Sequence, residues 1–168
     1  AVITALLVPF GRGARAAGTT WTVTNLNNSG AGSLRQAIAD AASGDTITFA
    51  AGLTGTITLT SGQLTIDKNL TIQGPGAGTL TVSGNNASRV FLINSFQTVS
   101  ISGLTIANGY SAGNNGGGIL NSGTLTVTNS TLSGNSASSG GGIYVNAGTL
   151  TVTNSALSGN SATWGGGI

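Results

Sequence analysis

The feature that most constrains this chain is a short phrase, Gly-Gly-Gly-Ile, that occurs three times in its last third. The copies occupy Gly116–Ile119, Gly140–Ile143 and Gly165–Ile168, so the spacing between them is almost constant. Between them a second phrase, Thr-Leu-Thr-Val-Thr-Asn-Ser, begins at Thr124 and returns with the same spacing at Thr149. A fixed period of this length predicts a repeat architecture, in which each turn of chain stacks on the preceding one.

Weaker copies of the repeat extend the pattern towards the N-terminus as three ladders of apolar residues. Successive members of a ladder recur with nearly the same period, in short stretches where apolar residues alternate with Thr or Ser. Alternation with period 2 and β-branched residues is typical of a strand with one buried face. The three ladders are Ile72, Ile101, Val127 and Val152; Val82, Ile106, Leu132 and Leu157; and Ile93, Ile119, Ile143 and Ile168.

Three ladders predict three short strands in each coil of about 24–26 residues, joined by corners rich in Gly, Asn and Ser. Coils in register place each strand about 4.8 Å from its copy, so all strands pair in parallel. The sequence therefore predicts an all-β fold, a parallel β-helix or β-solenoid, with coils over residues 46–168. The chain stops at Ile168 in the middle of a repeat, so we expect an open C-terminal end.

Asparagine also recurs with the period of the repeat. Asn94, Asn121 and Asn146 each follow an apolar strand residue. Asparagine tolerates the left-handed backbone angles of turns, and stacked side-chain amides hydrogen-bond along a column. We interpret this column as stabilising the corners, in preference to a row of polar groups that binds a ligand.

One stretch before the coils has helical periodicity. Ser33 and Gln36 have the spacing of a capping box, in which Ser33 is the N-cap and the Gln36 side chain reaches back to it. Apolar residues follow at helical spacing from Leu34 to Ala41, and Gly44 lies where a helix stop is expected. We predict a helix over residues 33–42 within an N-terminal cap, residues 19–45, that covers the apolar end of the first coil.

The N-terminal segment, residues 1–18, differs from the rest of the chain. The apolar run from Ala1 to Phe10 is too short to span a bilayer of about 30 Å. The Ala-Arg-Ala motif at residues 14–16 resembles the cleavage site of a secretory signal. Two interpretations stay open, a leader that is removed and an N-terminal arm that is retained. Both predict export to the cell surface or the extracellular space, without a transmembrane span.

Charged residues are scarce, and this limits the chemistry that the chain supports. It contains no His, Cys or Glu, and only 5% of its residues are charged. From residue 19 onward three cations balance three acids, Asp40, Asp45 and Asp67, none of which recurs with the repeat. Without a basic stripe we expect no nucleic-acid binding. Without paired carboxylates, His or Cys we predict no catalytic residues, no metal ligands and no cofactor.

Aromatic side chains suggest an alternative to a purely structural chain. Tyr144 lies between apolar positions and is expected to point outward, whereas Tyr110 and Trp164 lie at corners flanked by Ser and Gly. Exposed rings stack on sugars, so these three residues are candidate glycan contacts. They do not form a row in register, however, and local packing over glycine-rich corners is the interpretation that we favour.

The repeats resemble those of secreted bacterial proteins that fold as right-handed, single-stranded parallel β-helices. The likeness is to polymorphic outer-membrane-protein and autotransporter-passenger repeats, which combine a Gly-Gly-Ala-Ile phrase with Phe-x-x-Asn. Gly140–Ile143 corresponds to the first phrase, and Leu132–Asn135 and Leu157–Asn160 correspond to the second, with Leu in place of Phe. Residues 32–49 are similar to the N-terminal start of many secreted β-helices. The resemblance implies a right-handed coil and export, and it leaves the function open.

These features predict a non-catalytic extracellular structural protein, a β-helix subunit of a cell-surface or extracellular filament or coat. Open strand edges template further pairing, so we expect self-association or the continuation of a longer chain. An adhesin or glycan-binding stalk module is the alternative function. A polysaccharide lyase or hydrolase ranks third, because hydrolysis of a glycosidic bond needs two carboxylates that face it.

Overall fold

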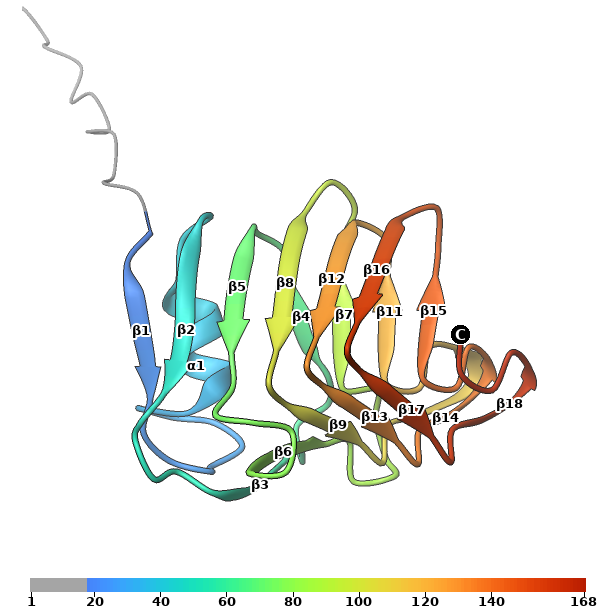
Figure 1. The fold of residues 1–168 in the computed structure, drawn as a ribbon, viewed down its shortest axis with the longest axis horizontal. Coiled ribbons are helices and arrows are strands. Elements are labelled where there is room, and N and C mark those ends of the chain that lie inside the picture. The colour runs from blue at the N-terminus through green and yellow to red at the C-terminus, as the bar shows by residue number, and fades with distance from the viewer. Residues whose placement is uncertain (1–17) are drawn as a thin grey trace, which may run out of the picture.

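The computed structural model describes residues 18–168, which form a parallel β-solenoid of six stacked turns (Figure 1). The largest sheet has the strand order β1-β2-β5-β8-β12-β16, and each neighbouring pair in it is parallel. Its strands are Thr20–Val23 (β1), Asp45–Phe49 (β2), Leu70–Gln73 (β5), Thr98–Ser102 (β8), Thr124–Thr128 (β12) and Thr149–Thr153 (β16). The predicted all-β solenoid of stacked parallel coils is confirmed.

Three smaller parallel sheets form the remaining sides of the coils. A five-stranded sheet contains Gly55–Thr58 (β3), Leu80–Ser83 (β6), Thr105–Ala107 (β9), Thr131–Ser133 (β13) and Ala156–Ser158 (β17). A four-stranded sheet contains Leu64–Ile66 (β4), Phe91–Ile93 (β7), Ile119–Asn121 (β11) and Ile143–Val145 (β15). A three-stranded sheet contains Tyr110–Asn115 (β10), Ser136–Ser139 (β14) and Ser161–Trp164 (β18).

The sheet formed by β10, β14 and β18 departs from the prediction of three strands per coil. The coils β8–β11 and β12–β15 have four strands each, so the predicted number is too low for them. The sequence of β14, Ser-Ala-Ser-Ser, has no alternation of apolar and polar residues and is typical of a corner. Its backbone nevertheless pairs in parallel with the coils on either side, because stacking in register satisfies backbone N–H and C=O groups whatever the side chains are.

Alternating side chains place the core inside the coils. In β12 the residues Leu125 and Val127 are buried, and Thr124, Thr126 and Thr128 between them are not. Burying one such aliphatic side chain contributes about 1.5–3 kcal/mol, so the stacked ladders supply most of the driving force. Two of these ladders have the register Ile72–Ile101–Val127–Val152 and Val82–Ile106–Leu132–Leu157.

The third predicted ladder contains a wrong residue, because Ile93 does not pair with Ile119. Ile119 pairs with Ile143 on one side, as expected, but on the other side it pairs with Phe91 and not with Ile93. Ile93 lies two residues further along β7 and pairs with Asn121. The prediction fails because β7 has two buried apolar residues, and spacing alone does not decide which of them continues a ladder.

The last member of that ladder also differs from expectation. Ile168 is predicted to be a buried rung, but it lies beyond β18, in no strand, and is 57% exposed. No described strand pairs with Ile168, so it does not continue the ladder of Ile119 and Ile143.

The helix α1 comprises Leu34–Asp40 and is shorter than the predicted 33–42. Ser33 is its N-cap, and its Oγ accepts a hydrogen bond from the backbone N–H of Gln36 at 3.2 Å. The reciprocal contact of a capping box does not form, because the Gln36 amide donates to Asp40 Oδ1 at 2.8 Å instead. Leu34, Ala37 and Ile38 are buried on the face that α1 turns to the core.

The solenoid sheet begins before the predicted boundary at residue 46. The strand β1 pairs in parallel with β2, with Thr20 opposite Thr46, so the segment assigned to the cap contributes its own strand to the sheet. The sequence Thr-Trp-Thr-Val is too short to be recognised as a strand. The proposed leader or arm over residues 1–18 lies, except for Gly18, outside the described residues.

Candidate functional site

The three acidic residues lie on different elements and hold different structural contacts. Asp45, at the start of β2, is buried, and its carboxylate accepts hydrogen bonds from Thr19 N (2.8 Å), Trp21 Nε1 (2.9 Å) and Ala42 N (2.8 Å). Asp40 accepts from Gln36 within α1, and Asp67 lies 3.5 Å from Lys68 Nζ. Residues 18–168 contain no cluster of three acidic, His or Cys side chains that would hold a metal ion.

Lys68 is held by the end of the helix. Its Nζ donates to the backbone carbonyls of Ile38, Ala39 and Ala41 at 3.2–3.3 Å. A cation at this place satisfies carbonyls that have no partner within the helix and favours the negative end of the helix dipole. Sequence reasoning saw only the neighbouring Asp67, because a contact with carbonyls one coil away along the chain leaves no local signal.

Arg89 is a clamp between coils. Its guanidinium donates to Gly116 O (2.8 Å), Gln63 Oε1 (2.6 Å), Asn115 O (2.7 Å) and Ser111 Oγ (3.1 Å), on the coils before and after its own. Burial lowers the pKa of this guanidinium from its ordinary value. All four acceptors are neutral, so the group acts as a hub of hydrogen bonds and not as half of an ion pair.

Arg35 has a similar role on α1. It donates to the carbonyls of Asn28 (3.1 Å), Gln63 (2.9 Å) and Gly62 (2.6 Å), and partial burial lowers its pKa as well. With Arg89 and Lys68, it completes the set of described cations. Each of them is engaged by backbone or amide oxygens of the solenoid.

The prediction that Asn94, Asn121 and Asn146 form a stacked column is wrong. Asn121 pairs with Ile93 and Val145, so Asn94 and Asn146 lie one residue out of register with it. Asn121 instead occupies an inward position of β11 and is fully buried. Its side chain is satisfied there, because Nδ2 donates to Thr149 O (2.9 Å) and Oδ1 accepts from Gly123 N (3.0 Å).

A true asparagine stack lies at Asn135 and Asn160. Asn135 Nδ2 donates to Asn160 Oδ1 at 2.9 Å, and the Asn135 backbone N–H donates to the same oxygen at 3.0 Å. Asn135 Nδ2 also donates to Ile106 O at 3.0 Å, and its Oδ1 accepts from Gly109 N at 2.8 Å. This stack joins three coils through side-chain amides.

The glycine triplets face these asparagines. A Cβ added to Gly118 would lie 3.1 Å from Cγ of Asn135, and one added to Gly142 would lie 3.3 Å from Cγ of Asn160. A Cβ at Gly141 would lie 2.4 Å from Ser161 O. The triplets are therefore glycine because the Asn side chain and the neighbouring backbone occupy the space that side chains would need.

The three aromatic candidates for glycan contact are not brought together. Tyr110 opens β10 and is 43% exposed, Trp164 ends β18 and is 74% exposed, and Tyr144 is half-buried in β15 of a different sheet. Tyr110 pairs with Ser136, whereas Trp164 pairs with Ser139 at the far end of β14. They form no shared binding surface.

Sequence reasoning missed the most exposed aromatic residue, Phe96. Its side chain is 98% exposed, and its backbone φ of 67° lies in the left-handed region. That region costs a non-glycine residue about 1–2 kcal/mol, and an exposed Phe forgoes about 1.5–3 kcal/mol of burial. The exposed ring therefore gains no burial energy to offset the cost of its backbone angle, and residues in such unfavourable conformations cluster at functional sites.

The signal that would have found Phe96 is the length of its corner. The corner between Ile93 and Val99 spans positions 94–98, whereas the paired corners in the next two coils span only positions 122–124 and 146–149. The longer corner stands out above its neighbours before β8 (Figure 1). An insertion in an otherwise regular repeat marks a surface feature that stacking does not require.

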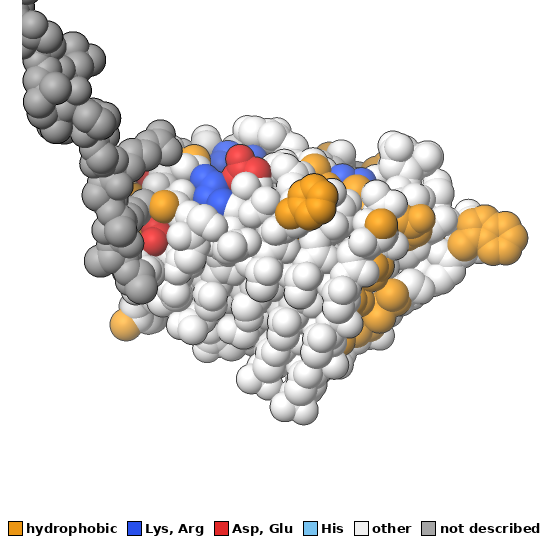
Figure 2. Space-filling model, turned by 90° about the horizontal axis from the view of Figure 1, so that it is seen from above, with side chains coloured by type: hydrophobic (Ala, Val, Ile, Leu, Met, Phe, Trp, Pro, Cys, Tyr) orange, Lys and Arg blue, Asp and Glu red, His pale blue; other side chains and the backbone are white. Residues whose placement is uncertain are grey.

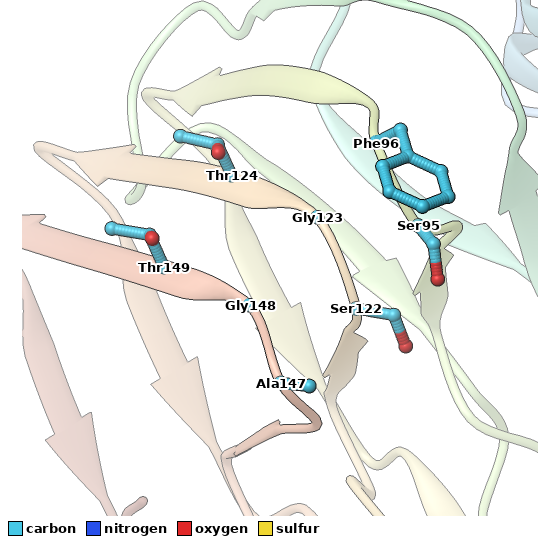
Figure 3. A pocket seen from close by; sticks show the side chains of 8 residues that line it. All are labelled: Ser95, Phe96, Ser122, Gly123, Thr124, Ala147, Gly148 and Thr149. Carbon is cyan, nitrogen blue, oxygen red and sulfur yellow. The ribbon is translucent and has the colours of Figure 1, made fainter.

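A shallow depression of about 340 Å³ lies beside Phe96 across successive corners. Its lining comes from three coils and consists of Ser95, Phe96, Ser122, Gly123, Thr124, Ala147, Gly148 and Thr149. Thr124 and Thr149 lie at the start of adjacent strands, and each follows a glycine (Figure 3). The Phe96 ring lies next to Ser95, in the upper right of the same view. The depression has no charged group in its lining. On the face of the molecule seen in Figure 2, red and blue side chains are few and most of the surface is white.

Comparison of the chain with protein-family models, with curated proteins and with solved structures finds no match. Within residues 18–168 no helix has the length and apolar character needed to cross a membrane.

Proposed function

We propose that this protein is a non-catalytic structural β-helix, exported to the cell surface or the extracellular space, that self-associates into a filament or coat. The observation that supports this most directly is how its charged side chains are used. Asp45, Arg35, Lys68 and Arg89 make contacts between coils or between a coil and α1, whereas the contacts of Asp40 and Asp67 are local, to Gln36 within α1 and to the adjacent Lys68. Most of the described charged groups therefore hold neighbouring parts of the stack together.

The proposal includes the finer features of the fold. We propose a right-handed coil, because parallel strand connections are right-handed in about 98% of cases. We also propose that α1 acts as an N-terminal cap, since its buried face of Leu34, Ala37 and Ile38 belongs to the core and Lys68 fixes its end. At this end β1 is itself the edge of the large sheet, so the helix covers the core and not the strand edge.

The opposite end has the properties of a surface that another coil covers. Val127 in β12 is fully buried, whereas its partner Val152 in β16 is only partly buried, and the same holds for Leu132 and Leu157. The strand β16 is the edge of its sheet, with its outer N–H and C=O groups unpaired by any described strand. Such an edge pairs with a further coil, from a second copy or from more of the same chain.

Electron microscopy and analytical ultracentrifugation of the purified chain test self-association. We expect assemblies that lengthen with concentration and that Val152→Lys abolishes, because a charge on the inward side of β16 opposes coverage. Thr151→Lys, on the outward side of the same strand, is the matched control and leaves assembly intact. Short isolated rods at every concentration, or assemblies indifferent to Val152→Lys, would argue against the proposal.

A polysaccharide lyase or hydrolase ranks below this function, because the acids that it would need are engaged in separate structural contacts. The adhesin or glycan-binding alternative loses its support at Tyr110, Tyr144 and Trp164, which share no surface. A different observation favours glycan binding at Phe96, and it is developed below.

A further inference from the structure

Phe96 has no structural reason to be a large aromatic residue. Its side chain is 98% exposed and does not belong to the core cluster, while its backbone adopts an angle that favours glycine. Apart from Ala147, the other described residues with positive φ are Asn or Gly, as at Asn129, Asn154 and Gly103. A glycine at position 96 would fit the backbone better and would lose no packing within the protein.

The depression beside the ring is lined mainly by residues that carry hydroxyl groups, and not by further large apolar side chains. Ser95, Ser122, Thr124 and Thr149 line the depression, and none of their hydroxyl groups makes a hydrogen bond to another described residue. Ala147 contributes the other apolar side chain of the lining. The site therefore offers one flat apolar ring and four hydroxyl groups that both donate and accept.

We propose that the corner of Phe96 and the depression beside it bind a neutral oligosaccharide. A pyranose ring has an apolar C–H face and a rim of hydroxyl groups. Its face stacks on the exposed Phe96 ring, and its hydroxyl groups exchange hydrogen bonds with Ser95, Ser122, Thr124 and Thr149. The lining carries no charge, so a neutral sugar matches the site better than an acidic one.

The repeat places equivalent residues along the rod axis, so a bound oligosaccharide is expected to run along that axis. Thr124 and Thr149 are paired residues on adjacent coils, as are Gly123 and Gly148 before them. Adjacent coils are about 4.8 Å apart, close to the length of one pyranose unit. An oligosaccharide that runs along the rod axis from Phe96 therefore meets equivalent hydroxyl groups at successive sugar units.

A protein partner fits the same surface less well. The cores of protein interfaces are contiguous apolar patches, whereas Phe96 stands apart among hydroxyl groups and glycine backbone. The saccharide proposal rests on Phe96 and the depression beside it. With the end-to-end association proposed above, which involves β16 and β17, it shares Thr149, the first residue of β16.

The test is isothermal titration calorimetry, in which the full chain is titrated with a panel of soluble hexasaccharides: cello-, manno-, malto-, laminari- and chitohexaose. We expect at least one of them to bind. Phe96→Gly is expected to weaken that binding about tenfold or more, equivalent to about 1.4 kcal/mol. Phe96→Trp is expected to retain it, because a larger ring preserves the stacking face. Tyr110→Ala is the matched control at another exposed aromatic residue and leaves the affinity unchanged.

A stability measurement separates a ligand contact from a structural role. Phe96→Gly is expected to keep or raise the urea midpoint, because glycine relieves the backbone angle and removes no buried contact. Three results would overturn the proposal: no hexasaccharide binds, Phe96→Gly leaves binding intact, or Phe96→Gly lowers the urea midpoint. A loss of self-association in Phe96→Gly without saccharide binding would assign the ring to a contact between proteins, and this also refutes the proposal.

Discussion

Replacement of Asn135 by alanine tests whether side-chain amides hold the coils together. The Asn135 side chain is fully buried and makes three hydrogen bonds, to Gly109, Ile106 and Asn160. Alanine removes all three and leaves the Gly109 N–H inside the solenoid without an acceptor. Gly109 is buried, so we expect its N–H group to stay without a partner in the variant.

The expected loss of stability follows from these contacts. A buried donor without a partner costs about 1–3 kcal/mol, and each hydrogen bond lost beyond it costs about 0.5–1.5 kcal/mol. We expect Asn135→Ala to lower the free energy of unfolding by about 3 kcal/mol. With a slope of about 2 kcal/mol per molar urea, the unfolding midpoint falls by about 1.5 M.

Urea unfolding followed by far-UV circular dichroism measures this effect. The matched control is Asn129→Gly, because Asn129 is an exposed corner residue with a φ of 49°, an angle that glycine adopts without strain. We expect this control to change the free energy of unfolding by less than about 0.5 kcal/mol. An equal shift for the two variants would refute the reasoning, since asparagine would then matter only through the backbone of its corner.

Two further substitutions test other contacts between coils by the same assay. Gly141→Ala is expected to lower the free energy of unfolding by about 3 kcal/mol or more, because the new Cβ would lie 2.4 Å from Ser161 O. Gly78→Ala is the control, because there is open space around its Cβ, and we expect it to change the free energy of unfolding by less than about 0.5 kcal/mol. Equal stability of the two variants would contradict this reasoning. Arg89→Met keeps the length of the side chain but removes four hydrogen bonds, and we expect a loss of about 3 kcal/mol, with Arg89→Lys intermediate. A neutral result for Arg89→Met would mean that water replaces the clamp.

The sequence predicted the parts of the fold that repeat strictly. The ladder through Val127 and Val152 follows from identical phrases at a constant spacing, and the structure pairs these residues. The ladder through Ile93 failed because corner length varies there, and a change in corner length breaks the link between spacing and register. The strand β14 was missed because its pairing depends on backbone groups, which a pattern of side chains does not report.

The candidate site was predictable only in part. Residue type and sequence neighbourhood indicate Tyr110 and Trp164 as exposed aromatic residues, but they do not indicate Phe96. The exposure of Phe96 depends on the conformation of a corner longer than its neighbours, and residue type alone does not determine that conformation. The contacts that Lys68 and Arg89 make with residues far away in the sequence were not predictable either, because their acceptors are mostly backbone carbonyls, which every residue has.

The two tryptophans of the chain make its ends separately observable. Trp21 lies in β1, the first strand of the solenoid, where its indole donates to Asp45, and Trp164 lies in β18, the last strand. In a stack where each coil contacts only its neighbours, distant coils are able to unfold separately. Fluorescence of Trp21→Phe and Trp164→Phe variants therefore reports on the coil of the remaining tryptophan, and a difference between their denaturation curves measures which of the two coils opens first.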